Sequence, residues 1–394
     1  MADYEACNGV AIGSLEACNG VSKTNIETIN GLTVPAASSG ATQWVARTED
    51  GLACYASNSD LTSWTGFVSF DALGGSLGAA DTDFVGFGKD ANGNGIYMSA
   101  NKDPGGNRHE MSVSGTDVTT GDKWTTVDIN SNSSNNHEIM CVMWGARSDG
   151  TAAGTWMAVG DMNPRSIFRS TDGGANWSTI DLSTLTGTAT NDYINGIASD
   201  GQGRWMCAQD NRIYYSTDDG ATWAVSTPFS TNVPGRPHFI VYTNQSWVLC
   251  YSRSQVVRFR SCAASDITDW GDEATGIGMA HNTHNDFTVK MAAANGNVVA
   301  CSEADVDINR FTVSGKTIGT ISRKILTDDI PGISVVASMA TDGNTWVVGC
   351  RDGDAAKSTD NGANWTQIVD AFEPVSGAGL VDWEGITANV VLPL

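Results

Sequence analysis

The sequence has no run of eighteen consecutive apolar residues, and its start, MADYEACNGVAIGS, has no basic segment followed by an apolar run. The first absence argues against a membrane-spanning helix, and the second against a secretory signal peptide. Basic residues are also scarce, because 22 Lys and Arg stand against 44 Asp and Glu, for a formal net charge of −22 at pH 7. This balance makes nucleic acid and membranes unfavourable partners.

Cysteine is present, but without the spacing of a disulfide framework or a metal site. The nine cysteines are an odd number, and no CxxC or Cys/His pattern occurs. Four of them end similar apolar segments, WMC, WVLC, VVAC and WVVGC, at Cys207, Cys250, Cys301 and Cys350. We therefore predict buried thiols that act as small apolar side chains between packed sheets.

Short apolar segments and turn residues alternate along most of the chain. Runs of Thr, Val and aromatic residues are separated by clusters of Gly, Asn, Asp and Ser, and Gly alone accounts for 44 residues. This alternation is typical of many short strands joined by tight turns. The chain is predicted to be essentially all-β.

The pattern S-x-D-x-G-x-x-W recurs in SIFRSTDGGANWSTI, YYSTDDGATWAVS and AKSTDNGANWTQI. Around each copy the same order of strands and turns can be traced, as in Asn191 to Trp223. The tryptophans at 177, 223, 270 and 365 are spaced by 46, 47 and 95 residues, the last interval being two periods. Four strands per unit and a period near fifty residues predict a β-propeller with seven units.

The first unit begins at TQWVARTEDG with its second strand, so its innermost strand is missing there. We predict that VDWEGITANVV, residues 381–391, supplies this strand and removes the open sheet edges of an unclosed ring. The predicted organisation is an N-terminal repeat segment at 1–34, a linker at 35–42 and a seven-bladed propeller at 43–394.

The repeated motif resembles the Asp-box of sialidase-like (BNR) propellers. The resemblance implies a hairpin turn between the two outer strands of a blade, and the residue types explain why. The Asp accepts backbone N–H groups, Gly adopts a positive φ, and Trp covers the neighbouring sheet. The role is thus structural for the three full matches, which are Ser170, Asp172, Gly174, Trp177, Ser216, Asp218, Gly220, Trp223, Ser358, Asp360, Gly362 and Trp365.

Catalysis is not predicted. A sialidase would, by resemblance, carry an arginine triad, a Tyr/Glu pair and an Arg-Ile-Pro segment, and that segment is absent. Sialidases also have six blades rather than seven. An Asp-box glycoside hydrolase with acid or base carboxylates on the channel face stays as an alternative, with the candidates Asp83, Glu138, Asp192 and Asp286.

No cofactor or metal is predicted. DANGNG at 90–95 matches half of a calcium loop, but Asn101 stands where a bidentate Glu would be expected, so we interpret the segment as an ordinary turn. HNTHND at 281–286 offers two imidazoles and a carboxylate without a defined third ligand, and is interpreted as a loop.

Basic and titratable residues recur in the loops expected around the central channel. The loops between second and third strands and those entering the inner strands should emerge on the face opposite the Asp-boxes. Their side chains either tie neighbouring blades together by ion pairs or line a funnel for a glycan or protein loop. The candidate ligand-binding residues are Arg108, Arg165, Arg212, Arg310, Asp83, His137, Asp192, His238, His284 and Asp286.

Residues 5–34 contain an eleven-residue repeat, EACNGV, EACNGV and ETINGL. Its Asn-Gly pairs require tight turns, and three short units cannot bury an apolar stripe alone, so the segment needs a partner. It resembles NGV and NGL repeats of tailed-bacteriophage structural proteins.

That resemblance implies a non-enzymatic virion protein, a tail or capsid appendage made in the host cytoplasm and attached to other virion proteins through residues 1–34. Its propeller would bind a receptor, with a host-surface glycan or protein as the ligand, or decorate the particle. A homo-oligomer is left open. The alternatives are the hydrolase above and an assembly-factor propeller that binds another protein.

Overall fold

The computed structural model describes most of the chain from residue 43 onward and short strand pairs before it. The described residues are 6–7, 10–11, 17–18, 21–22, 28–29, 32–33, 43–48, 52–56, 61, 64–69, 84–100, 110–116, 118, 124–129, 138–161, 166–185, 194, 196–209, 212–226, 236–254, 256–280, 289–302, 306–368 and 383–388. The chain divides into two units, Met1–Ala41 and Thr42–Leu394.

The first unit contains three short antiparallel strand pairs. In each pair, two two-residue strands flank one of the Asn-Gly dipeptides of the repeat, and Asn-Gly is a preferred sequence for a two-residue hairpin connection. The pairs are β1 (Ala6–Cys7) with β2 (Val10–Ala11), β3 (Ala17–Cys18) with β4 (Val21–Ser22), and β5 (Thr28–Ile29) with β6 (Leu32–Thr33).

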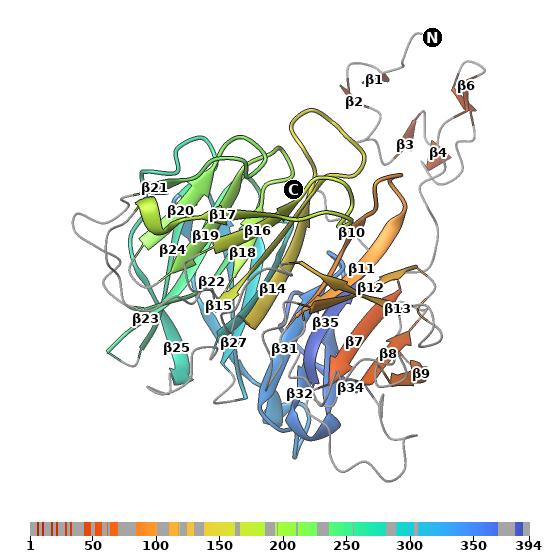
Figure 1. The fold of residues 1–394 in the computed structure, drawn as a ribbon. Coiled ribbons are helices and arrows are strands. Elements are labelled where there is room, and N and C mark those ends of the chain that lie inside the picture. Colours follow the sequence, from red (N-terminus) through yellow and green to blue (C-terminus); the bar gives the residue numbers. More distant parts are fainter. Residues whose placement is uncertain are drawn as a thin grey trace. The chain divides into compact units, whose positions relative to one another are not determined.

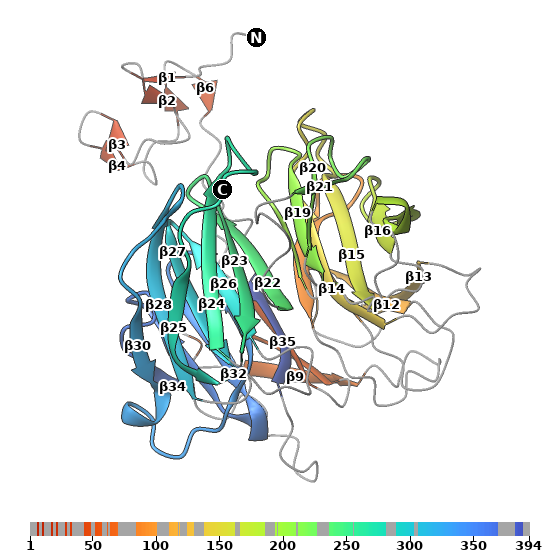
Figure 2. The ribbon, with the colours of Figure 1, turned by 90° about the vertical axis from the view of Figure 1, so that its left-hand side faces the viewer.

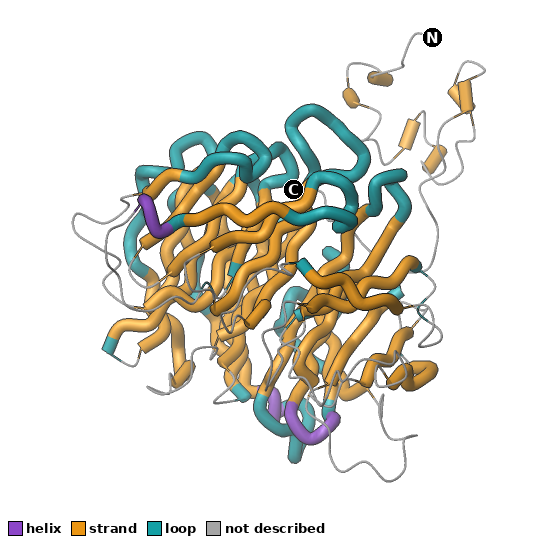
Figure 3. Tube along the Cα trace, in the orientation of Figure 1, coloured by secondary structure: helices purple, strands orange, loops and turns teal. Residues whose placement is uncertain are grey.

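The second unit is a seven-bladed β-propeller, as predicted (Figures 1 and 2). Each blade is an antiparallel sheet whose strands follow one another outward from a first strand, and the first strands of successive blades adjoin around the ring. Strands dominate the trace in Figure 3, with only short 3-10 turns at η5 (Ser183–Leu185), η6 (Leu326–Asp328) and η7 (Arg351–Gly353) among the described residues. None of the described helices is long and apolar enough to span a bilayer.

The blades are numbered here along the chain, and their strands are given from the first strand outward. Blade 1 has β35 (Trp383–Ala388), β7 (Trp44–Thr48), β8 (Leu52–Ala56) and β9 (Trp64–Ser69). Blade 2 has β10 (Val85–Lys89), β11 (Gly95–Ala100), β12 (Glu110–Gly115) and β13 (Trp124–Asp128). Blade 3 has β14 (Glu138–Gly145), β15 (Thr155–Asp161), β16 (Ser166–Ser170) and β17 (Ser178–Asp181).

Blade 4 has β18 (Ile197–Ser199), β19 (Trp205–Gln209), β20 (Arg212–Ser216) and β21 (Ala224–Ser226). Blade 5 has β22 (Arg236–Thr243), β23 (Ser246–Arg253), β24 (Val256–Ala263) and β25 (Ala274–Ala280). Blade 6 has β26 (Val289–Ala294), β27 (Asn297–Ser302) and β28 (Asp307–Ser314), which pairs with both β29 (Thr317–Ile318) and β30 (Ser322–Ile325). Blade 7 has β31 (Val336–Thr341), β32 (Trp346–Cys350), β33 (Ala355–Ser358) and β34 (Thr366–Ile368).

The C-terminal strand closes the ring. β35 pairs antiparallel with β7, with Thr387 opposite Val45 and Ala388 opposite Trp44. Blade 1 is therefore built from both ends of the propeller sequence, and the predicted closure by residues 381–391 is confirmed for the strand Trp383–Ala388.

The hydrophobic core lies between the blades, in clusters that each join two neighbours. Tryptophans stand at or near the start of several second strands, and Trp156, Trp205 and Trp346 are fully buried there. The predicted buried thiols are also confirmed, since Cys207, Cys250, Cys301 and Cys350 are buried and are not in disulfides. Burial raises the pKa of the Cys207 thiol, because a thiolate is poorly solvated there.

The segment 90–95 forms the turn between β10 and β11. Asp90 Oδ1 accepts the backbone N–H groups of Asn92 and Asn94, both at 2.8 Å, and Asn94 Nδ2 donates to Asp90 Oδ2 at 3.0 Å. The carboxylate thus holds its own turn. Among the described residues no group of three or more His, Cys, Asp or Glu side chains is arranged to hold a metal, and residues 281–286 lie outside them.

Candidate functional site

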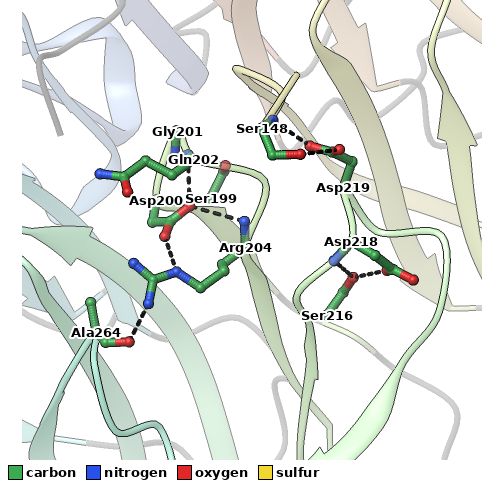
Figure 4. A network of polar contacts seen from close by, with 10 residues as sticks. All are labelled: Ser148, Ser199, Asp200, Gly201, Gln202, Arg204, Ser216, Asp218, Asp219 and Ala264. Carbon is green, nitrogen blue, oxygen red and sulfur yellow. Dashed lines mark hydrogen bonds and ion pairs between the residues drawn. The ribbon is translucent and has the colours of Figure 1, made fainter. Parts of the chain in front are cut away.

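The Asp-box of blade 4 is a closed hydrogen-bond circuit within one turn, and Figure 4 shows its bonds between Ser216 and Asp218. The Ser216 hydroxyl donates to Asp218 Oδ1 at 2.8 Å and accepts the Gly220 N–H at 3.0 Å. Asp218 Oδ1 also accepts the Thr222 N–H at 2.8 Å, and Asp218 Oδ2 accepts the Thr222 hydroxyl at 2.6 Å. Gly220 adopts φ of 76°, which explains the glycine.

The other two boxes repeat this circuit. Asp172 accepts both the backbone N–H and the side-chain amide of Asn176, and Asp360 does the same with Asn364. Partial burial disfavours the charged forms of Asp172, Asp218 and Asp360, but the hydrogen bonds they accept outweigh it and lower the pKa of each. A carboxyl with a lowered pKa is a poor proton donor, which fits a structural role.

Each box also packs on the preceding blade. Trp223 Nε1 donates to Gly220 O at 3.0 Å, and the indole joins the cluster shared by blades 3 and 4. A Cβ at Gly220 would overlap with Met157 Cε of blade 3. Two features therefore require glycine at position 220: its positive φ, and the contact with Met157, which leaves no room for a Cβ.

A second link joins the box of blade 4 to blade 3. Asp219, the residue between the box Asp and Gly, is buried, and its carboxylate accepts the Ser148 N–H at 2.8 Å and the Ser148 hydroxyl at 2.7 Å. Arg169 Nε donates to Asp219 O at 2.9 Å. Ser148 lies in the turn between β14 and β15, so these bonds clasp two blades together at the box end (Figure 4).

Blade 4 is tied to blade 5 by a buried carboxylate. Asp200, which is fully buried, accepts the backbone N–H groups of Gln202 at 2.8 Å and Arg204 at 3.0 Å, and pairs with the Arg204 guanidinium. The same guanidinium donates to Ala264 O of blade 5 (Figure 4). These bonds fix the turn 200–204, which joins the first and second strands of blade 4.

The central channel contains a cavity of ≈390 Å³, within the size range of ligand pockets. First strands from all seven blades contribute to its wall. Its side chains are mostly apolar and include Phe84, Met143, Phe239, Val241, Met291 and Met339. Gly201, Gln202 and Thr341 line it where the first strands turn into the second, which is also the end of the blades that carries the Asp-boxes.

The first strands are sheet edges. Each pairs on one side only, with the second strand of its blade. Alternate backbone N–H and C=O groups of an edge strand point away from its sheet, here toward the channel, where they can bind water or an extended chain. The wall thus combines flexible apolar side chains with main-chain donors and acceptors, a combination suited to polypeptide.

The predicted funnel residues are only partly placed by the structure. Arg212 is half-buried at the start of β20, next to the expected loop. Arg310 lies inside β28, opposite Val299, and not in a loop between second and third strands, because β28 already begins at Asp307. His238 is buried inside β22 at a β-bulge rather than in the loop before it.

The remaining candidates lie outside the residues whose placement the structure describes. They are Arg108, Arg165, Asp83, His137, Asp192, His284 and Asp286, together with the side chain of Glu138. Sequence reasoning missed the cavity residues altogether, since apolar residues of a channel-facing first strand follow the same pattern as those of a buried strand. Only the order of strands in the blade could have distinguished channel-facing apolar residues from buried ones.

Seven blades, six of them four-stranded and blade 6 five-stranded, are closed by a C-terminal strand and carry three complete S-x-D-x-G-x-x-W turns, which define an Asp-box β-propeller. Residues 117–271, less than half of the chain, match the family model of the photosynthesis system II assembly factor YCF48. No curated protein sequence gives a significant match.

Solved structures share the fold at low sequence identity. A candidate 6-phosphogluconolactonase from Bacteroides fragilis NCTC 9343 is 12% identical, with a TM-score of 0.56 over 90% of this chain and 99% of that one. A second one, from Bacteroides uniformis ATCC 8492, is 11% identical, with a TM-score of 0.53 over 89% and 99%. YCF48 bound to a D1 peptide is 14% identical, with a TM-score of 0.49 over 78% and 92%.

The prediction of a virion location is wrong. The matched family is an assembly factor of photosystem II, not a component of a virus particle. The comparisons also give no support to the bacteriophage resemblance of the N-terminal repeats or to virion partners. They favour the alternative interpretation, a propeller of the assembly-factor type.

Proposed function

We propose that this protein is a non-catalytic, polypeptide-binding propeller of the YCF48-like assembly-factor type, and that a partner protein inserts an extended segment into the central channel. The observation that carries the proposal is the channel cavity, with its methionine-rich wall formed by the edge strands of all seven blades. Methionine side chains are unbranched and polarisable, and they adapt to different apolar partners. The family match over residues 117–271 supports the same class of function.

The binding mode follows from the wall. Apolar side chains of the bound segment would contact Met143, Met291 and Met339, while its backbone would pair with channel-facing N–H and C=O groups of the first strands. Each fully buried apolar side chain contributes roughly 1.5–3 kcal/mol, offset by the cost of ordering the segment. Two or three such contacts total roughly 3–9 kcal/mol before that cost, which corresponds to a dissociation constant in the millimolar to micromolar range.

Fluorescence anisotropy with two labelled peptides tests the proposal. One is a neutral peptide with the sequence Ser-Gly-Leu-Met-Leu-Met-Leu-Gly-Ser, and the other is a D1 peptide, since such a peptide is bound in a solved YCF48 structure. Gln202→Trp places a bulky side chain at the exposed edge of the cavity and should weaken binding at least about tenfold. The backbone N–H bond from residue 202 to Asp200 does not depend on the side chain, so the fold should be retained.

The matched control is Gln367→Trp, the same substitution at an exposed position of the outer strand β34. It should leave both the thermal midpoint and peptide binding unchanged. The proposal fails if neither peptide binds the full chain, or if Gln202→Trp binds them as tightly as the control does.

A further inference from the structure

We propose that the segment received by the channel is basic, with lysine or arginine residues flanking an apolar centre, and that it enters at the end of the channel that carries the Asp-boxes. This end, where the first strands turn into the second, is called the turn-side mouth below. The inference rests on the proposed function and adds the chemistry of the partner.

The cations described at the turn-side mouth are already engaged. Arg147 Nη2 lies 2.8 Å from Asp149 Oδ2, within the turn that follows β14. Arg204 pairs with the buried Asp200 and donates to a carbonyl of blade 5. Lys89 Nζ lies 5.6 Å from the ring centre of Trp144, a distance at which the ammonium interacts with the aromatic face.

Two carboxylates at the same mouth have no cationic partner among the residues that the structure describes. Asp90 and Asp342 each follow the end of a first strand and accept only N–H groups of their own turns, from residues 92 and 94 and from residues 344 and 345. These bonds leave the negative charges in place, in turns that continue two first strands of the mostly apolar cavity wall.

Further carboxylates near the turn-side mouth add to its negative charge. The boxes place Asp172, Asp218 and Asp360 at the same end of the blades, and the chain as a whole carries a formal charge of −22. Fields of this kind raise the local concentration of oppositely charged ligands and act over about 10 Å at 0.1 M salt. An acidic segment would meet repulsion at this mouth, whereas a basic one would be attracted.

The test compares three labelled peptides that share the centre Leu-Met-Leu-Met-Leu, flanked by Ser-Gly, by Lys-Lys or by Glu-Glu pairs. At 50 mM salt the full chain should bind the Lys peptide at least about tenfold more tightly than the Glu peptide, with the neutral one between them. The difference should shrink to about threefold or less at 500 mM salt, because salt screens exposed charges.

The variant Asp90→Asn/Asp342→Asn removes two charges at the turn-side mouth while keeping an acceptor oxygen for each turn. It should weaken binding of the Lys peptide about three- to tenfold and leave the neutral peptide within twofold. The matched control is Asp181→Asn/Asp328→Asn, which removes two exposed charges outside the turns between first and second strands, one at the end of β17 and one in η6. It should change the binding of neither peptide by more than twofold.

The outcomes separate this inference from the proposed function. Equal binding of the Lys and Glu peptides, or equal effects of the two double variants, overturns the basic partner, and the proposed function stands if the neutral peptide still depends on Gln202. If no peptide binds at any salt concentration, the proposed function itself fails.

Discussion

The clasp between Asp219 and Ser148 offers a direct test of how neighbouring blades are held together. Asp219→Ala removes both hydrogen bonds to Ser148, at 2.8 and 2.7 Å, from a residue that is only 7% exposed. Hydrogen bonds to a charged group are worth about 1.5–3 kcal/mol each when buried, and the exposed side of Ser148 lets water recover part of this loss. The lost bonds should therefore cost about 1–3 kcal/mol.

Backbone conformation adds a second cost. Residue 219 has φ of 57°, in the left-handed region that Asp and Asn tolerate better than Ala. Ala should lose roughly 1 kcal/mol more for this reason, which brings Asp219→Ala to about 2–4 kcal/mol. Asp219→Gly removes the bonds without this strain, and Asp219→Asn keeps one acceptor oxygen, so the expected loss decreases in the order Ala, Gly, Asn.

Urea unfolding of the four proteins, followed by tryptophan fluorescence, measures these differences, and a double-mutant cycle with Ser148→Ala isolates the contribution of the hydroxyl. The coupling in that cycle should be about 0.5–1.5 kcal/mol. The reasoning is refuted if Asp219→Gly is as stable as the parent chain, because the clasp would then contribute nothing.

Four further expectations concern the boxes, the ring and the N-terminal unit. Asp218→Ala should lower the free energy of unfolding by roughly 1–3 kcal/mol without affecting peptide binding, and a loss of binding at full stability would contradict its structural role. Because the folded-state pKa values of Asp172, Asp218 and Asp360 are lowered, they add stability that is complete above their unfolded pKa near 4 and is lost as pH falls through the folded values. Acid unfolding followed by circular dichroism should therefore have a midpoint below about pH 4. The acid-induced loss of stability should be smaller in Asp218→Asn than in the parent chain, because one of these carboxyl groups is missing. Deleting 381–394 should give aggregated or molten protein through open sheet edges, so a monomer with an unchanged melting temperature would disprove the closure. Removing 1–34 should leave the melting temperature of the propeller unchanged, and a destabilised product would show that the two units fold as one.

The repeat made most of the architecture predictable. The period locates the turn between the outer strands of each blade. The resemblance between VDWEGITANVV and the start of another unit was enough to assign the closing strand. Both features are local in sequence, because every blade must present the same pattern to its neighbours.

The clasp at Asp219 was missed because it occupies a variable position of the box. The equivalent residues are Gly173 and Asn361, and all three have positive φ, at 76°, 57° and 58°. Gly, Asp and Asn are the residues that best tolerate this conformation. Because this position of the box holds only these three residue types, the sequence alone could have indicated its positive φ. Which of them also bonds to the next blade depends on the facing turn, and a single box does not contain that information.

Arg310 was misplaced for a different reason. The sequence DINRFT resembles the loops of other blades, but blade 6 has lost its box and pairs β28 with both β29 and β30. Its third strand therefore starts earlier than the repeat suggests. Alignment by repeat is unreliable where the motif that anchors it has decayed.

Pairing between β35 and β7 has a consequence for how the chain is made. At about 5–20 residues per second, Trp44 leaves the ribosome roughly 20–70 s before Trp383, so β7 waits that long for its partner. Joining the two ends then closes a loop of more than 300 residues, at an entropic cost on the order of 5 kcal/mol. During synthesis the nascent chain therefore carries a strand with one unpaired edge, and this interval is when chaperones, or misdirected pairing with another nascent chain, would act on it.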